Sequence, residues 1–334
     1  MLNGKIILIT GGTGSFGHQF VDYVLENYEP QKVIIYSRDE YKQFLMQNEY
    51  KNHPQFAKLR FFIGDVRDKE RLYRAFDGVD YVVHAAALKQ VPSCEYNPME
   101  AVKTNINGAM NIVDAALDCG VKRVVALSTD KAVNPINLYG GTKLVSDKLF
   151  IAANAYAGEK DVNFSVVRYG NVAGSRGSVI PFFRNIVANG GTSLPITDYR
   201  MTRFWISLDQ GVELVIKALS EAKGGETFIS KIPSFKITDL AQAILPGCEM
   251  PEVGIREGEK LHEIMITKED SMLTYEYDRH FIIYPHFRWW DDNRVIPGGK
   301  HVRRGFEYSS GTNTEWLNVE QLEEYLENIG VTEK

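Results

Sequence analysis

Short apolar runs alternate with longer amphipathic stretches through the first half of the chain. The apolar runs predict β-strands at residues 5–9, 32–36, 59–63, 80–84, 122–127 and 163–168. The stretches between them predict helices at about 15–27, 68–76, 99–118 and 139–157. Apolar positions within the strands are continuous rather than alternating. This indicates burial on both faces, and therefore a parallel sheet covered by helices.

Past Tyr169 the alternation gives way to short elements and loops rich in Gly, Pro and aromatic residues. The pattern predicts an α/β chain with a Rossmann-like, doubly wound parallel sheet at 1–170 and a smaller mixed α/β lobe at 171–334. Because no linker separates the two parts, we expect them to share an interface. Some segments of the second part are expected to return to the first domain.

Composition narrows the class of protein. The 334 residues carry 38 basic and 43 acidic side chains, a formal net charge of -5, and no basic stripe, which argues against nucleic-acid binding. No apolar run approaches the ~20 residues of a membrane span, and the N-terminus leads directly into the first strand. The 3 cysteines have no metal-like spacing, so no metal site is predicted. We expect a soluble protein of the cytoplasm.

A glycine-rich turn lies between the first strand and the first helix, at Thr10–Gly17. Glycines there let backbone N–H groups approach a pyrophosphate at the helix N-terminus. A purely structural turn can carry the same glycines, but the flanking strand and helix favour dinucleotide binding. The predicted cofactor-binding residues of this turn are Gly11, Thr13, Gly14, Ser15, Phe16 and Gly17.

The end of the second strand indicates which dinucleotide binds. An NAD-binding chain usually has an acidic residue there, to bond the ribose 2′-hydroxyl. Here Ser37 and Arg38 stand at that place, and an arginine suits the 2′-phosphate of NADP. A solvated surface arginine is the alternative, and the nearby Asp39 keeps NAD open. We predict NADP.

Two further strand ends carry candidate cofactor residues. The third strand leads into Asp65 and Val66, where a carboxylate can accept a hydrogen bond from an adenine amine; a helix cap is the alternative. The fourth strand ends in small residues, Ala85 and Ala86, which let the backbone lie against a cofactor. His84 before them is predicted to be a packed histidine rather than a base.

The segment after the fifth strand carries the candidate chemistry. Tyr139 and Lys143 are four residues apart at a helix start, so they project from one face. A neighbouring ammonium and a cationic nicotinamide both favour the phenolate, so we expect the pKa of Tyr139 to fall. The pair can then take a proton from a secondary alcohol while the cofactor takes hydride. Thr129 can add a hydrogen bond to the same substrate oxygen.

Asp130 and Lys131 are an acid and a base that a plain dehydrogenase does not need. Once an alcohol becomes a ketone, the adjacent C–H becomes acidic. A base can remove that proton while an acid protonates a hydroxyl on the next carbon, which leaves as water. Lys131 can be this base only if its pKa is lowered, and Asp130 can be the acid only if its pKa is raised. A surface ion pair is the alternative.

These motifs resemble the extended short-chain dehydrogenase/reductases, and within them the UDP-N-acetylglucosamine 4,6-dehydratases that invert C5. The resemblance covers nearly the whole chain. Beyond the segments above, it rests on the longer runs 85–92, 167–172, 174–183, 201–205 and 258–263. In retaining relatives the residue after the catalytic Asp is Glu, so Lys131 points to inversion.

The resemblance implies a lyase that oxidises C4 of UDP-GlcNAc, removes water across C5 and C6, and inverts C5. The product is the L-arabino 4-keto-6-deoxy sugar nucleotide, the first step of pseudaminic acid synthesis. NADP would be tightly bound and recycled. The resemblance further implies UDP-sugar contacts from Lys89, Asn171, Val179, Ile180, Pro181, Phe182, Phe183, Thr197, Arg256 and Glu259.

Three alternatives stay open: a C5-inverting dehydratase that also epimerises C3, a UDP-sugar 4-epimerase, and an NADP-sensing protein without catalysis. The group that epimerises C3 lacks the tyrosine of the Tyr–Lys pair, so Tyr139 favours the simpler dehydratase. The resemblance also implies a homo-oligomer, usually a dimer through two helices per subunit. Residues 279–304 match no motif, and we expect a surface hairpin or an oligomer contact there.

Overall fold

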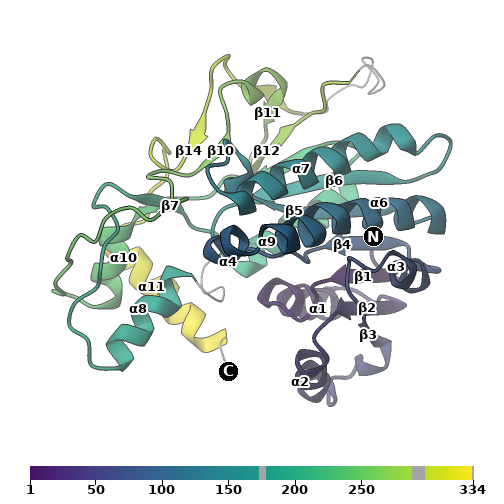
Figure 1. The fold of residues 1–334 in the computed structure, drawn as a ribbon, viewed down its shortest axis with the longest axis horizontal. Helices are drawn as coiled ribbons and strands as arrows, with labels where there is room; N and C mark the ends of the chain where they lie inside the picture. The colour runs from purple at the N-terminus through teal and green to yellow at the C-terminus, as the bar shows by residue number, and fades with distance from the viewer. Residues whose placement is uncertain (173–177, 288–297, 333–334) are drawn as a thin grey trace.

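The computed structural model describes residues 1–172, 178–287 and 298–332. Their main sheet is built from β1 (Ile6–Thr10), β2 (Lys32–Ser37), β3 (Leu59–Ile63), β4 (Tyr81–His84), β5 (Arg123–Thr129), β6 (Asn163–Tyr169), β8 (Thr227–Ser230), β11 (Thr274–Glu276), β12 (His280–Ile283) and β13 (Lys300–His301). The strand order across these described residues is β13-β11-β12-β8-β6-β5-β4-β1-β2-β3 (Figure 1). Residues 174–177 of the run 174–183, and 288–297 of the unmatched segment, lie outside the described residues.

The first six strands pair in parallel, in the spatial order 3-2-1-4-5-6. This is the order of dinucleotide-binding doubly wound folds, so the predicted Rossmann-like α/β class is confirmed. Each of these strands lies within about two residues of its predicted position. The order reverses between β1 and β4, and ligands bind at such a reversal, beyond the carboxyl ends of the strands.

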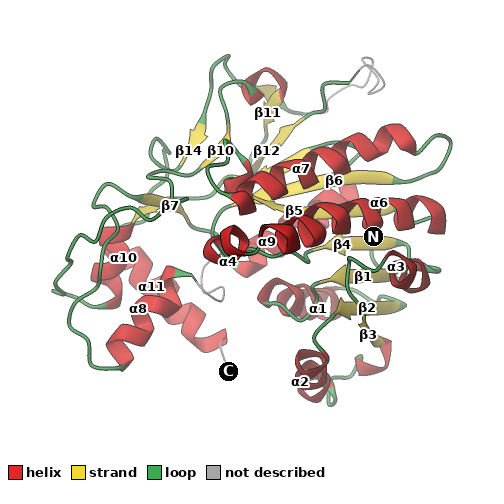
Figure 2. Cartoon of the chain, viewed as in Figure 1, coloured by secondary structure: helices red, strands yellow, loops and turns green. Residues whose placement is uncertain are grey.

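Helices cover both faces of the sheet (Figure 2). One face carries α1 (Ser15–Asn27), α2 (Glu40–Tyr50) and α9 (Leu208–Glu221). The other carries α3 (Lys69–Phe76), α6 (Gly108–Cys119) and α7 (Leu138–Ala153). Two separate buried apolar clusters result, one on each side of the strands. This explains why apolar residues occur on both faces of the strands.

The C-terminal half adds strands to the main sheet and also forms a smaller lobe. Strand β8 pairs in parallel with β6, and β12 then adds an antiparallel strand to it. The remainder forms a smaller lobe with its own buried cluster, from α8 (Val179–Ala188), α10 (Ile237–Ile244), α11 (Val319–Thr332), β7 (Thr202–Phe204) and β9 (Ser234–Lys236). A separate two-stranded sheet, formed by β10 (Ile264–Ile266) and β14 (Tyr308–Ser309), lies beside β7 (Figure 1). Among the described residues, no helix is both long and apolar enough to cross a bilayer.

The predicted helix at 99–118 is interrupted. It consists of α5 (Pro98–Val102), a π-helical turn at Lys103–Asn107 and α6. The π turn directs the buried Asn105 at the loop after β4, where its amide bonds both the N–H (2.8 Å) and the C=O (2.9 Å) of Leu88. It also donates to the Thr142 hydroxyl on α7. One side chain thus fixes the loop that lines the cleft described below.

Replacing Asn105 with Ala should leave the N–H of Leu88 without a partner and its carbonyl with only the weak thiol donor of Cys94, at 3.6 Å. We expect the free energy of unfolding to fall by about 2–4 kcal/mol, from the usual cost of unsatisfied buried groups. Urea denaturation followed by circular dichroism measures the change. The matched control is Asn107→Ala, an exposed position of the same π turn. Equal effects at the two positions would refute the role given to Asn105.

Candidate active site

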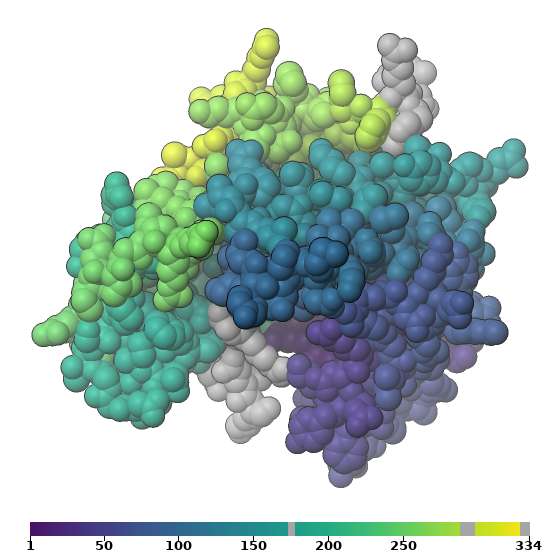
Figure 3. Space-filling model, in the orientation of Figure 1, coloured from purple at the N-terminus to yellow at the C-terminus, as the bar shows by residue number. Residues whose placement is uncertain are grey.

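A cleft of about 1120 Å³ lies at the carboxyl ends of the parallel strands. The space-filling view shows a hollow at the lower edge, between the purple N-terminal part and the teal lobe (Figure 3). Nearly all the residues predicted for cofactor, catalysis and substrate line this one cleft. From the first domain these are Gly11, Thr13, Gly14, Ser15, Phe16, Gly17, Ser37, Arg38, Asp65, Val66, Ala85, Ala86, Lys89, Thr129, Lys131, Tyr139 and Lys143. From 171–334 they are Asn171, Val179, Pro181, Phe182, Phe183, Thr197, Arg256 and Glu259.

The glycine turn is shaped to bring backbone close to a ligand. Gly11 has φ +67°, and a Cβ there would lie 2.9 Å from the Cα of Ala86. At Gly17 a Cβ would overlap the carbonyl oxygen of Gly12. Gly14 is the N-cap of α1 and offers no side chain to cap its N–H groups. These features fit a dinucleotide pyrophosphate at the start of α1.

The ends of β2 and β3 also suit the cofactor. The side chain of Asp39 accepts from the N–H of Lys42 and caps α2, so it has a structural role. The exposed Arg38 lines the cleft, and its Nη1 lies 3.9 Å from Asp65 Oδ2. Asp65 is bonded by Arg67 through backbone and side chain. Arg38 therefore adds a positive group at this edge of the cleft, where Lys42 also lies.

His84 is packed in the core, as predicted. Its Nδ1 lies 2.8 Å from the Thr10 hydroxyl, which also accepts from the N–H of Ala86. Burial lowers the pKa of His84 to about 3, so it is neutral at physiological pH. The histidine supports the wall at Ala86 and does not face the cleft.

Helix α7 presents the predicted Tyr–Lys pair. The Asn137 side chain caps the helix by accepting from the N–H of Gly140, and donates to the carbonyl of Gly258. A Cβ on Gly140 would overlap the carbonyl oxygen of Lys131, so the helix start and the loop after β5 pack in direct contact. Tyr139 is thereby held beside Thr129–Lys131, and Lys143 follows one turn later, buried.

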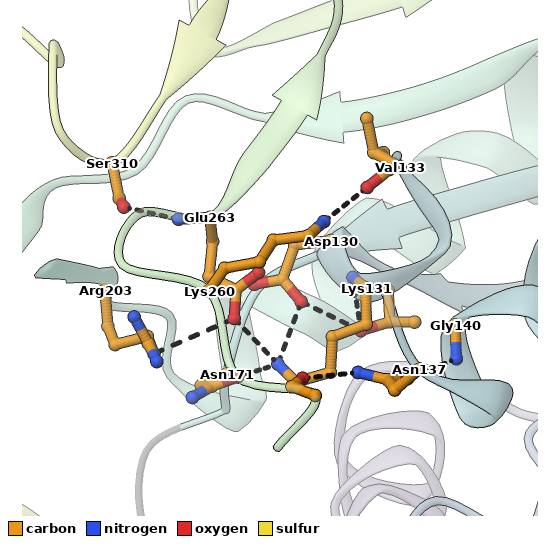
Figure 4. Close-up of polar contacts among 12 residues, drawn as sticks. Asp130, Lys131, Val133, Asn137, Gly140, Asn171, Arg203, Lys260, Glu263 and Ser310 are labelled. Atoms are coloured by element: carbon orange, nitrogen blue, oxygen red, sulfur yellow. Dashed lines mark hydrogen bonds and ion pairs between the residues drawn. The ribbon is translucent and has the colours of Figure 1, made fainter. Parts of the chain in front are cut away.

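Lys131 is the centre of a compact charged cluster (Figure 4). Its Nζ lies 3.2 Å from Asp130 Oδ1, 3.0 Å from Asn171 Oδ1 and 3.2 Å from Glu263 Oε1. Arg203 Nε approaches the same Glu263 oxygen at 3.7 Å. These side chains come from the ends of β5 and β6, from β7 and from the loop before β10. Three distant segments therefore meet at one ammonium group, and β7 joins them through the contact of Arg203 with Glu263.

The pKa of Asp130 is shifted upward, as the sequence analysis required. Burial and the neighbouring Glu263 raise the pKa of Asp130. Its Oδ1 accepts from the Thr129 hydroxyl at 3.0 Å, while Oδ2 has no hydrogen-bond partner among the described residues. That oxygen faces Gly170 in the cleft wall, where a Cβ would lie 3.3 Å away. This upward shift of the Asp130 pKa is the direction that a proton donor beneath the cleft surface requires.

The sequence predicts lowered pKa values at Lys131 and Tyr139. With only the protein's own groups around them, both pKa values are raised instead. Burial lowers the pKa of Lys131, but the carboxylates of Asp130 and Glu263 outweigh it and raise the pKa well above its usual value. Burial raises the pKa of Tyr139 to about 12, against the lowering effects of Lys131 and a Thr129 hydrogen bond. Burial lowers the pKa of Lys143, partly opposed by Asp147.

Two predicted site residues do not line the cleft. Ile180, expected to contact the sugar, is buried in the core of the smaller lobe, because α8 turns the opposite face toward the cleft. Asp130 lies just beneath the surface. Conversely, Glu263 and Arg203 line the cleft, and sequence reasoning assigned no role to either. The available signal was their position inside the long specific runs 258–263 and 201–205.

Comparison with known proteins gives four likenesses. Residues 7–285 match the family model described as polysaccharide biosynthesis protein. Over 328 residues the chain is 56% identical to the UDP-N-acetylglucosamine 4,6-dehydratase (inverting) of Campylobacter jejuni subsp. jejuni serotype O:23/36 (strain 81-176), covering 96% of this chain and 97% of that protein. It is 40% identical over 334 residues to the UDP-glucose 4-epimerase of Rickettsia canadensis (strain McKiel), covering 98% and 96%. The solved structure of Pen from Bacillus thuringiensis has a TM-score of 0.90 and 37% identity, over 99% of both chains.

Gly17→Ala should push α1 away from the glycine turn and weaken dinucleotide binding. We expect the dissociation constant for NADP to rise more than tenfold, about 1.4 kcal/mol or more. Isothermal titration calorimetry with NADP measures this. Gly141→Ala on α7 is the control, because no atom lies within 4 Å of a Cβ built there. An unchanged affinity in Gly17→Ala would show that the pyrophosphate binds elsewhere.

Proposed function

Because this chain belongs to the polysaccharide biosynthesis protein family, we propose that it catalyses the 4,6-dehydration of UDP-N-acetylglucosamine with inversion at C5. The resemblance inferred from its motifs is confirmed by the 56% identity over nearly the full length of both chains. The product would be UDP-2-acetamido-2,6-dideoxy-β-L-arabino-hex-4-ulose. The proposed place of this reaction is the start of pseudaminic acid synthesis.

One observation carries the proposal. Lys131 lines the same cleft as Tyr139 and Lys143, and Asp130 lies directly beneath it, within one packed unit of β5 and α7. Oxidation and reduction at C4 alone would need only the Tyr–Lys pair. A second acid and base beside it suits removal of water from the neighbouring carbons.

The roles of the side chains follow from their places. Tyr139 takes the proton of the C4 hydroxyl, and Lys143 one turn away favours the phenolate. The glycine turn and Arg38 would hold a nicotinamide dinucleotide, which would supply the hydride chemistry: reversible oxidation at C4 and reduction at C6. Lys131 removes the C5 proton, which the C4 ketone makes acidic. Asp130 protonates the C6 hydroxyl so that it leaves as water. Once C6 has gained hydride, a solvent-derived proton from the opposite face restores the C5–H bond with inverted configuration, and Tyr139 returns its proton to solvent.

Substrate and cofactor are proposed to share the cleft end to end. The proposed cofactor is NADP, tightly bound and recycled, with its 2′-phosphate at Arg38. The proposed sugar-nucleotide contacts lie toward the smaller lobe, at Lys89, Asn171, Val179, Pro181, Phe182, Phe183, Thr197, Arg256 and Glu259. An arginine such as Arg256 suits a diphosphate, because its fork matches phosphate oxygens.

A UDP-sugar 4-epimerase is the second candidate function. The relatives of that name at about 40% identity, aligned along nearly the whole chain, favour it. An epimerase would return a product that keeps its C6 hydroxyl. The two candidates therefore differ in one chemical group of the product.

The assembly is proposed to be a homo-oligomer in the cytoplasm, where nucleotide sugars are made. Support for the contact comes from exposed apolar side chains on the adjacent α5, α6 and α7, namely Met99, Met110 and Val145. Exposed apolar patches of this kind commonly mark protein–protein contacts.

Incubation of the NADP-loaded protein with UDP-GlcNAc should give a product with a C6 methyl group and no net accumulation of NADPH. Proton NMR detects the methyl doublet, and in heavy water it also reports deuterium at C5 and the configuration there. Lys131→Met keeps the length of the side chain without its amine, and should abolish both the methyl signal and the deuterium uptake. A product retaining its C6 hydroxyl would support the epimerase instead.

Arg38→Ala should weaken binding of NADP but not of NAD. The loss of one charge-assisted contact to the 2′-phosphate predicts roughly a tenfold or greater rise in the dissociation constant for NADP. Calorimetric titration with both dinucleotides gives the ratio. Lys42→Ala is the control, a lysine at the same edge of the cleft whose ammonium pairs with Asp39. A change of equal size for NAD and NADP would contradict the assignment.

A further inference from the structure

Glu263 is held rigidly although it belongs to no helix or strand (Figure 4). Its N–H donates to Ser310 Oγ at 2.9 Å, and its carbonyl accepts from the N–H of Ser310 at 2.8 Å. The Ser310 hydroxyl lies 2.8 Å from that of Thr202. Three separate parts of the chain therefore place one side chain, only 2% exposed, at the wall of the cleft.

Lys131 lies between two carboxyl groups at equal distance. Its Nζ is 3.2 Å from Asp130 Oδ1 and 3.2 Å from Glu263 Oε1. Both separations are within hydrogen-bond reach, so a proton can pass between the nitrogen and either oxygen without a water molecule between them. Asp130 already has an assigned task as the acid. Glu263 has none.

We propose that Glu263 accepts the ammonium proton of Lys131 and so leaves a neutral amine that can act as the base. This inference rests on the proposed dehydratase function. One N–H bond of Lys131 breaks and one O–H bond at Glu263 Oε1 forms, and the summed charge of the two groups stays the same. Glu263 acts through Lys131, and is therefore a positioning residue for the proton.

The remaining proton movements balance on the same three side chains. The amine of Lys131 takes the C5 proton while Asp130 gives its own proton to the departing C6 hydroxyl. Lys131 then passes a proton to Asp130 and regains one from Glu263. All three groups return to their starting forms, and the net result is one proton moved from C5 to the water that leaves.

The surrounding charges determine the resting form. Burial raises the pKa of Glu263, but Lys131, Arg203 and Lys260 outweigh it and hold the value below its usual range. On the other side, Asp130 and the Tyr139 phenol face Lys131. The ion pair is therefore the resting state.

A sugar bound over Lys131 and Glu263 favours the form in which both groups are neutral. The Lys131 side chain is 23% exposed, so part of the ammonium is still hydrated. A sugar in the cleft displaces that water, and loss of solvation disfavours an ion pair relative to two neutral groups. The proton thus moves when the substrate is in place.

The test is the pH dependence of kcat in Glu263→Gln. In the wild type the transfer changes no proton count, so kcat should vary little between about pH 6 and about pH 9. In the variant Lys131 must lose its proton to water, so kcat should be roughly 100-fold lower near neutral pH and rise about tenfold per pH unit. KM should stay within about threefold.

Two further variants separate this role from a structural one. Glu263→Asp keeps a carboxyl at slightly greater distance, and should lower kcat while retaining the flat profile. Glu221→Gln, in an exposed pair with Lys217 on α9, should match the wild type. If Glu263→Gln does not fold, the aspartate variant decides alone: a flat profile supports the proposal and a unit slope overturns it.

The experiments separate a wrong role for Glu263 from a wrong dehydratase function. A wild type that makes no C6-methyl product refutes the dehydratase and this inference together. A wild type that makes this product, beside a Glu263→Gln variant whose kcat runs parallel to it at every pH, overturns the role of Glu263 alone.

Discussion

The partly buried ammonium of Lys131 is the constraint around which the cleft is arranged. A charge removed from water is costly unless opposite charge and hydrogen bonds replace the lost hydration. Here Asp130, Asn171 and Glu263 supply them, each within 3.2 Å. The chain therefore has to bring the ends of β5 and β6 and the loop before β10 to one point. The smaller lobe packs against the carboxyl ends of these strands, where the three segments meet.

Local signals in the sequence were enough to predict the framework. The parallel strands are continuous apolar runs, and the glycine turn and the Tyr139–Lys143 pair each lie between a strand and a helix, as their chemistry requires. Helix α2 was not predicted, because Tyr41, Phe44 and Leu45 are exposed and blur its apolar stripe. The antiparallel addition of β12 to β8 also lacked a signal, since a strand of four residues carries little periodicity.

The site could be predicted only where its partners are neighbours in sequence. Burial gives Asp130 a raised pKa, and that direction followed from its place after a core strand. The sign for Lys131 was wrong because one of its partners, Glu263, lies 132 positions away. The prediction that Ile180 contacts the sugar was also wrong. The run around Ile180 was assigned to the sugar as a block, whereas in a helix only residues three or four positions apart share a face.

The Ser310 contacts of Glu263 bear on how the protein is made. A ribosome releases the chain from its N-terminus, so the glycine turn, β1–β6 and α7 can associate first. The anchor for Glu263 emerges only near residue 310 of 334. The sheet that carries the glycine turn can thus form before the cluster around Lys131 is complete. A polypeptide that stops short of residue 310 would accordingly lack the backbone hydrogen bonds that place Glu263.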